Sequence, residues 1–175
     1  MKILILLRHA KSDWDDPSQR DFDRPLNARG RKAAAAMGAE LRRLGLGFDR
    51  VVVSPSRRTT ETVERLAEAY GPLPLDYDER VYLASVPTLL RIVREIDDAH
   101  DRLMIVGHNP GMERLALSLA RDGELRDQVA AKFPTGALAE LSFDVASWGE
   151  IAEGAGALTR FIRPRDLAPD LGPDD

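Results

Sequence analysis

The sequence contains no cysteine in its 175 residues. Disulfide bonds, thiolate nucleophiles and zinc sites with cysteine ligands are therefore excluded, and a reducing compartment is permitted. No segment is both apolar and long enough to span a bilayer. We expect a cytoplasmic protein that does not act at a membrane.

The sequence also has no excess of positive charge. It contains 25 lysines and arginines and 29 aspartates and glutamates, which gives a formal charge of −4. General affinity for nucleic acid rests on a broad basic face, so no nucleic-acid partner is expected. Any site for a phosphorylated ligand must then be locally cationic.

Short apolar runs punctuate the chain. Residues 2–7 resemble the start of a secretion signal, but the stretch is brief, and Arg8 and His9 interrupt it before any small-residue cleavage site. We interpret it as a buried strand. The runs at 51–53 and 103–106 have the same pattern, which is typical of strands covered by helices on both faces.

Segments with helical periodicity separate these runs, at residues 33–44, 63–70 and 89–96, and a fourth helix is expected to begin near Pro110. Strands that alternate with helices predict an α/β fold, here a three-layer α/β/α sandwich with a mostly parallel central sheet. The length suits one domain, which we place at residues 1–166.

The C-terminal part of the chain has a different pattern. Residues 137–143 and 158–162 predict further strands, separated by a turn-rich stretch. Residues 167–175 are rich in proline and acidic side chains, so we expect a loosely ordered tail there.

Candidate functional side chains follow the three central runs at the point where each ends. They are Arg8 and His9, then Arg57 and Arg58, then His108 and Asn109. The carboxyl ends of parallel strands meet at one edge of a sheet, where open α/β sheets bind their ligands. We therefore expect two histidines and several arginines to lie together.

Each of these residues also has a structural interpretation. A lone histidine such as His9 is more often a hydrogen-bonded structural residue than a catalytic one. Asn109 can cap a helix that has Pro110 in its first position, although the same helix N-terminus makes Asn109 a candidate phosphate-binding residue. Arg57 and Arg58 begin a helix whose dipole disfavours cations there, which indicates an anionic partner.

Phosphoryl transfer to a histidine needs a neutral imidazole nitrogen aimed at phosphorus and donors around three equatorial oxygens. We assign His9 as the candidate acceptor and Arg8, Arg58 and His108 as candidate donors. Arginine suits this task because its planar fork forms charge-assisted bonds to phosphate oxygens. Such a site requires no metal and no other cofactor.

A zinc site built from His9, His100 and His108 is the competing interpretation. No two of these histidines have helical ligand spacing, and neighbouring arginines repel a cation. His100 lies in an acidic stretch and is most simply a surface residue. We therefore expect no metal site.

Three motifs stand at the strand ends: Arg8-His9-Ala10, Ser54-Pro55-x-x-Arg58-Thr59-x-Glu61-Thr62 and Gly107-His108-Asn109-Pro110. Their order and spacing resemble the histidine phosphatase superfamily, also called phosphoglycerate-mutase-like. Two further features, Arg24-Pro25-Leu26-Asn27-x-x-Gly30 and Phe161-Ile162-Arg163-Pro164, resemble the SixA-like phosphohistidine phosphatases. Ala10 is a departure, since the superfamily usually has glycine there, but alanine is the smallest change available.

The resemblance implies a phosphoglycerate-mutase-like fold, His9 as phosphate acceptor, and Arg8, Arg58 and His108 as phosphate ligands. Glu79 is similar to a glutamate that donates a proton in the mutase and phosphomonoesterase branches. An ordinary loop carboxylate is an equally good interpretation of Glu79. Mutase activity is not expected, because the 24 residues between Tyr82 and Gly107 lack the cationic insertion that holds a substrate carboxylate.

We therefore predict a metal-independent phosphatase that acts through a phosphorylated His9. The resemblance favours phosphohistidine in a protein as its substrate. The alternative is a general phosphatase of small phosphomonoesters, which would need an acid such as Glu79 to protonate its leaving group. A non-catalytic phosphoprotein-binding module is a more distant alternative, because it would not need the reactive histidine that this sequence retains.

Residues around the connection after the first run have mainly structural interpretations. Asn27 can cap the following helix, and Gly30 allows that helix to pack closely. Trp14 lies just past His9 and is expected to cover the core rather than contact a substrate.

Overall fold

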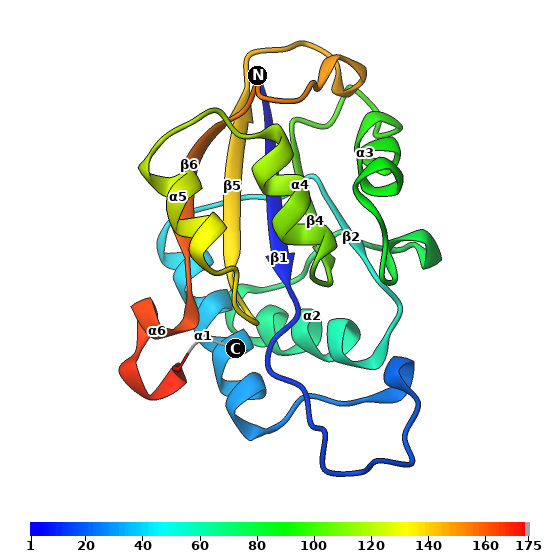
Figure 1. Cartoon of the computed structure of the whole chain (residues 1–175), viewed down its shortest axis with the longest axis vertical. Helices are drawn as coiled ribbons and strands as arrows, with labels where there is room; N and C mark the ends of the chain where they lie inside the picture. Colours follow the sequence, from blue (N-terminus) through cyan, green and yellow to red (C-terminus); the bar gives the residue numbers. More distant parts are fainter. Residues whose placement is uncertain (174–175) are drawn as a thin grey trace.

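A six-stranded sheet forms the centre of the molecule in the computed structural model, which describes residues 1–173 (Figure 1). The strands are β1 (Lys2–Arg8), β2 (Arg50–Val53), β3 (Leu75–Tyr77), β4 (Arg102–Gly107), β5 (Leu138–Phe143) and β6 (Ala157–Ile162). Their order is β3-β2-β4-β1-β5-β6. The first four of these are parallel, whereas β5 is antiparallel to β1 and β6 to β5.

Helices cover both faces of this sheet. The α-helices are α1 (Ala28–Arg43), α2 (Arg57–Tyr70), α3 (Val86–Arg94), α4 (Gly111–Leu119), α5 (Glu124–Ala131) and α6 (Pro164–Leu167). Four 3-10 turns are η1 (Asp21–Asp23), η2 (Glu79–Val81), η3 (Trp148–Glu150) and η4 (Pro169–Leu171). Helices α1 and α2 pack with one hydrophobic cluster, and α3, α4 and α5 pack with the other. The predicted three-layer α/β fold is confirmed.

Strand β1 shows why the central runs are continuously apolar. Leu4 and Leu6 point into the cluster beneath α3, α4 and α5, whereas Ile5 and Leu7 point into the cluster beneath α1 and α2. All four side chains are at most 1% exposed. A fully buried leucine stabilises the fold by about 1.5–3 kcal/mol, so both faces of this strand contribute.

The start of α1 is fixed by the two residues that the sequence singled out. The side chain of Asn27 accepts a hydrogen bond from the Gly30 amide at 2.8 Å, which is an N-cap. A Cβ atom at Gly30 would overlap the carbonyl oxygen of Lys11. The helix therefore packs directly on the connection that follows β1, seen in blue at the bottom of Figure 1.

Residues 167–173 differ from the loosely ordered tail that we expected. They include η4, and Leu171 is only 8% exposed. The backbone oxygen of Gly172 accepts a hydrogen bond from Arg29 on α1 at 3.3 Å. Burial of one leucine and this bond hold the segment against α1, and residues 174–175 of the expected tail lie outside the described residues. Across residues 1–173, none of the helices has the length and apolar character that crossing a membrane requires.

Candidate active site

The ends of β1, β2 and β4 bring the predicted site residues together. The His9 amide donates to the Gly107 oxygen and the Ser54 amide to the Val106 oxygen, both at 3.0 Å, so the three chains leave the sheet side by side. The rings of His9 and His108 lie 5.4 Å apart. His9, Arg58 and His108 are all buried, at 4–7% exposure. The predicted convergence of these residues is confirmed.

His9 is held in one protonation state. Its Nδ1 lies 2.7 Å from the backbone oxygen of Ala10. A carbonyl oxygen only accepts, so Nδ1 carries the proton in this bond. Burial above all, together with the positive charges of Arg58 and Arg8, keeps the pKa of His9 well below its usual value, against the opposing effect of the Ala10 bond. The ring is therefore neutral at physiological pH, with the lone pair on Nε2.

His108 is also neutral but is bonded on both ring nitrogens. Its Nδ1 accepts from Nη2 of Arg58 at 3.2 Å, and its Nε2 therefore donates to the Ser54 hydroxyl at 2.8 Å. Burial and the charge of Arg58 lower the pKa of His108 to about 3, against an opposing effect of Asp21. The one ring hydrogen of His108 is therefore engaged by Ser54 in this structure, and its role as a donor to phosphate stays a prediction.

Arg58 is bound to a residue that the sequence did not single out. Its Nη2 donates to Oδ2 of Asp21 at 3.0 Å, and its Nη1 donates to the Asp21 backbone oxygen at 2.7 Å. The Tyr82 hydroxyl donates to the same Oδ2 at 2.6 Å, and the Tyr82 ring packs edge-on against His108. Asp21 and Tyr82 therefore belong to the cluster. No spacing signal marks Asp21, because it lies in an irregular connection.

Arg8 approaches the cluster from β1. Its Nη1 donates to the Phe133 backbone oxygen at 3.0 Å. Burial lowers the pKa of Arg8 to about 10, partly offset by Glu113 and reinforced by Arg58, so it stays charged at neutral pH. Its charge in turn lowers the pKa of both His9 and His108. Arg57, in contrast, is exposed and pairs with Glu61 at 3.1 Å.

Asn109 stands next to the cluster but is engaged by the protein. Its amide donates to the Phe133 oxygen at 2.9 Å, and its Oδ1 accepts from the Glu113 amide at 3.2 Å. Helix α4 begins at Gly111 with Pro110 as its N-cap residue, so the predicted start with Pro110 in the first helical position is one residue early. Asn109 lies one residue before the N-cap, and its side chain caps the first turn of α4 through the Glu113 amide. A role in phosphate binding remains a prediction.

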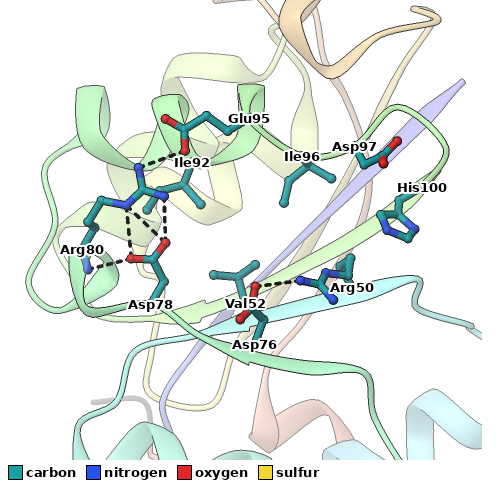
Figure 2. Close-up of a pocket in the computed structure, with 10 residues that line it drawn as sticks. All are labelled: Arg50, Val52, Asp76, Asp78, Arg80, Ile92, Glu95, Ile96, Asp97 and His100. Carbon is teal, nitrogen blue, oxygen red and sulfur yellow. Dashed lines mark hydrogen bonds and ion pairs between the residues drawn. The ribbon is translucent and has the colours of Figure 1, made fainter.

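Glu79 is the first residue of η2, which directly precedes Tyr82, and its side chain is exposed. The neighbouring Arg80 bonds Asp78 at 2.8 Å and Glu95, the C-cap residue of α3, at 2.9 Å, as Figure 2 shows. These ion pairs fasten η2, and with it Tyr82, beside His108. The role of Glu79 as an acid remains a prediction.

His100 lies at the other end of the sheet. It precedes the first residue of β4, whereas His108 follows the last. It lines a separate cavity of about 440 Å³, which Figure 2 shows with Arg50 and Asp97 beside it. The three histidines of the competing zinc interpretation are therefore not brought together, and residues 1–173 contain no group of three or more histidine, aspartate or glutamate side chains placed to hold a metal.

Trp14 does not cover the core as expected, since its side chain is 58% exposed. Its ring lies 4.0 Å from the guanidinium carbon of Arg24, and its Nε1 donates to the Ser12 hydroxyl at 2.8 Å. The cation–π contact shields a buried arginine and leaves the outer face of the indole in solvent.

Comparisons with known proteins agree with this geometry. Residues 4–82 match the model of the histidine phosphatase superfamily, branch 1. An uncharacterized protein of Mycobacterium tuberculosis strain H37Rv is 34% identical over 163 residues, which cover 91% of this chain and 100% of the relative.

Two solved structures are also similar. The SixA protein of Nakamurella multipartitia, assigned as a phosphohistidine phosphatase, has a TM-score of 0.81 and 26% identity, over 93% of this chain and 96% of that one. The SixA protein of Agrobacterium tumefaciens, with the same assignment, has a TM-score of 0.78 and 29% identity, over 93% and 98% of the two chains. The fold that this chain shares with its structural neighbours is phosphoglycerate-mutase-like.

Proposed function

The chain belongs to the histidine phosphatase superfamily, and from this membership we propose that it removes phosphate from phosphohistidine in a protein through a phosphorylated His9. The observation that carries the proposal is the bond from His9 Nδ1 to the Ala10 oxygen, which leaves the Nε2 lone pair as the nucleophile. The names of the two SixA structures support the substrate class.

In the first step, Nε2 of His9 attacks the phosphorus atom. A bond forms between that nitrogen and phosphorus, and the bond from phosphorus to the substrate imidazole breaks, with its electron pair going to the leaving nitrogen. A substrate ring already protonated on its other nitrogen leaves as neutral imidazole. The Ala10 oxygen stabilises the positive charge that then resides on phosphorylated His9.

In the second step, water attacks the phosphorus and the bond to Nε2 breaks. The electron pair returns to Nε2, both hydrogens of the water end on inorganic phosphate, and His9 is again neutral with its proton on Nδ1. Arg8 and Arg58 stabilise the charge on the equatorial oxygens in both steps, and His108 contributes its Nε2 hydrogen once a phosphoryl oxygen replaces the Ser54 hydroxyl as its acceptor. These donors supply the charge stabilisation that a metal ion provides in other phosphatases.

The ionised carboxylate of Asp21 favours phosphohistidine over phosphomonoesters as the substrate. An alkoxide leaving group needs an acid, and Asp21 is a poor one. Although burial alone would raise the pKa of Asp21, hydrogen bonds from Tyr82 and Arg58 lower it below its usual value, so this carboxyl is ionised at neutral pH. A leaving group that departs as neutral imidazole has no need of an acid.

A general phosphomonoesterase is the second candidate, and the position of Glu79 favours it. The backbone oxygen of Glu79 accepts from the Tyr82 amide at 3.2 Å, and the Tyr82 ring contacts His108. Glu79 is thus linked to the site through its backbone, and in this alternative its exposed carboxyl would protonate the alkoxide leaving group.

A comparison of specificity constants tests the proposal. We would measure kcat/KM for phosphohistidine proteins and peptides, phosphoramidate, p-nitrophenyl phosphate and alkyl phosphates under one set of conditions. The proposal predicts the highest values for phosphohistidine in a protein. Higher values for alkyl phosphates would support the phosphomonoesterase instead.

A further inference from the structure

Asp21 accepts hydrogen bonds from Arg58, the arginine that we expect to bind phosphate. Both terminal nitrogens of the Arg58 guanidinium donate to Asp21, one to its carboxylate at 3.0 Å and one to its backbone oxygen at 2.7 Å. These terminal N–H groups are the fork with which arginine binds phosphate oxygens. A phosphoryl group and Asp21 therefore compete for the same N–H donors of Arg58.

The burial of the two partners places Asp21 on the solvent side of the pair. The Arg58 side chain is only 5% exposed, whereas that of Asp21 is 39% exposed. A buried guanidinium without a counter-charge is costly, so the empty site needs an anion at this position. Asp21 supplies that anion and covers Arg58 toward solvent.

Tyr82 holds the competing carboxylate in place. Its hydroxyl donates to Oδ2 of Asp21 at 2.6 Å, and Phe22 of the same 3-10 turn packs edge-on against the Tyr82 ring at 5.0 Å. These contacts do not depend on Arg58. The carboxylate therefore stays beside the site when phosphate takes the guanidinium, and the two anions then compete for Arg58.

We propose that Asp21 is a positioning residue that competes with phosphate for the guanidinium of Arg58. It keeps the arginine in its binding orientation when the site is empty, and it weakens the hold on inorganic phosphate, so that the product of each turnover leaves quickly. The inference rests on the proposed function only in taking Arg58 as a phosphate ligand.

The experiment measures binding of inorganic phosphate to the full-length protein by calorimetry, and its inhibition constant against p-nitrophenyl phosphate. Asp21→Asn keeps the shape and removes the charge, and like charges in contact oppose binding strongly, so Kd and the inhibition constant should both fall by about 10- to 100-fold. Tyr82→Phe keeps the ring but releases the carboxylate, and should tighten phosphate binding by a smaller factor.

Asp23→Asn is the matched control, because Asp23 lies on the same 3-10 turn but pairs with Arg20 at the surface, at 2.8 Å. It should leave phosphate binding unchanged. A purely structural role for Asp21 would disorder Arg58 in Asp21→Asn and weaken phosphate binding, and this result, or an unchanged Kd, would overturn the inference. Neither result bears on phosphorylation of His9, which tests the proposed function separately.

Discussion

The neutral state of His108 makes the stability of the fold depend on pH. Its pKa is lowered to about 3 in the folded protein, and an exposed histidine in the unfolded chain titrates near 6.5. The unfolded chain therefore binds a proton between these values that the folded protein does not. The stabilisation is present above pH 6.5 and is lost as the pH falls toward 3.

The magnitude follows from the size of the shift. Each unit is worth about 1.4 kcal/mol, so the whole shift corresponds to about 5 kcal/mol, of which about 2 kcal/mol is lost between pH 7.5 and 5.0. His9 changes in the same direction, because burial keeps its pKa well below the usual value. The wild-type protein should therefore become markedly less stable over this interval.

The contribution of His108 to this pH dependence can be isolated by urea unfolding, followed by circular dichroism. The wild type and His108→Gln are each measured at pH 7.5 and at pH 5.0. The variant should lose about 2 kcal/mol less than the wild type between the two pH values, which is a difference of roughly 1 M in the urea midpoint. His100→Gln is the control, because His100 lies at the opposite end of β4. Equal losses in the wild type and in His108→Gln would refute the reasoning.

Three further outcomes are expected. Strong chelators should leave turnover unchanged, because arginines stabilise the transferring phosphoryl group, and a loss restored by added zinc or magnesium would contradict this. Glu79→Gln should change kcat/KM for phosphohistidine less than threefold, whereas a loss of about 10²–10⁴-fold confined to alkyl phosphates would identify Glu79 as a general acid. Gly30→Ala should destabilise the protein by at least about 3 kcal/mol in thermal unfolding, since the added methyl overlaps the Lys11 carbonyl. Gly47→Ala, where an added Cβ meets nothing within 4 Å, should be near neutral, and equal effects of the two substitutions would disprove the close contact.

The sheet and the main cluster were predictable because their signals are local. Each central strand is a continuous apolar run, and the polar residue that follows it, such as His9, Arg58 or His108, must lie at the same edge of a parallel sheet. The structural roles of Asn27 and Gly30 were predictable for the same reason, since a helix cap and a close helix contact each depend on a single residue.

The contacts made by irregular segments could not be predicted in this way. Asp21 reaches Arg58 from a connection without periodicity, and Tyr82 reaches Asp21 from 61 residues further along the chain. Trp14 was expected to cover the core, but its ring instead stacks on the guanidinium of Arg24 at the surface. Residues 169–171 lie in a stretch rich in proline and acidic side chains, yet the side chain of Leu171 is buried.

Trapping the phosphorylated enzyme tests the central claim most directly. The protein is mixed with ³²P-labelled phosphoramidate, quenched with alkali within milliseconds, and digested for mapping by mass spectrometry. The account predicts a phosphate on His9 that is labile to acid and stable to alkali, and that is absent from His9→Ala. Phosphate on Ser12, Ser54 or Ser56, or turnover with no labelled protein at any time, would contradict it.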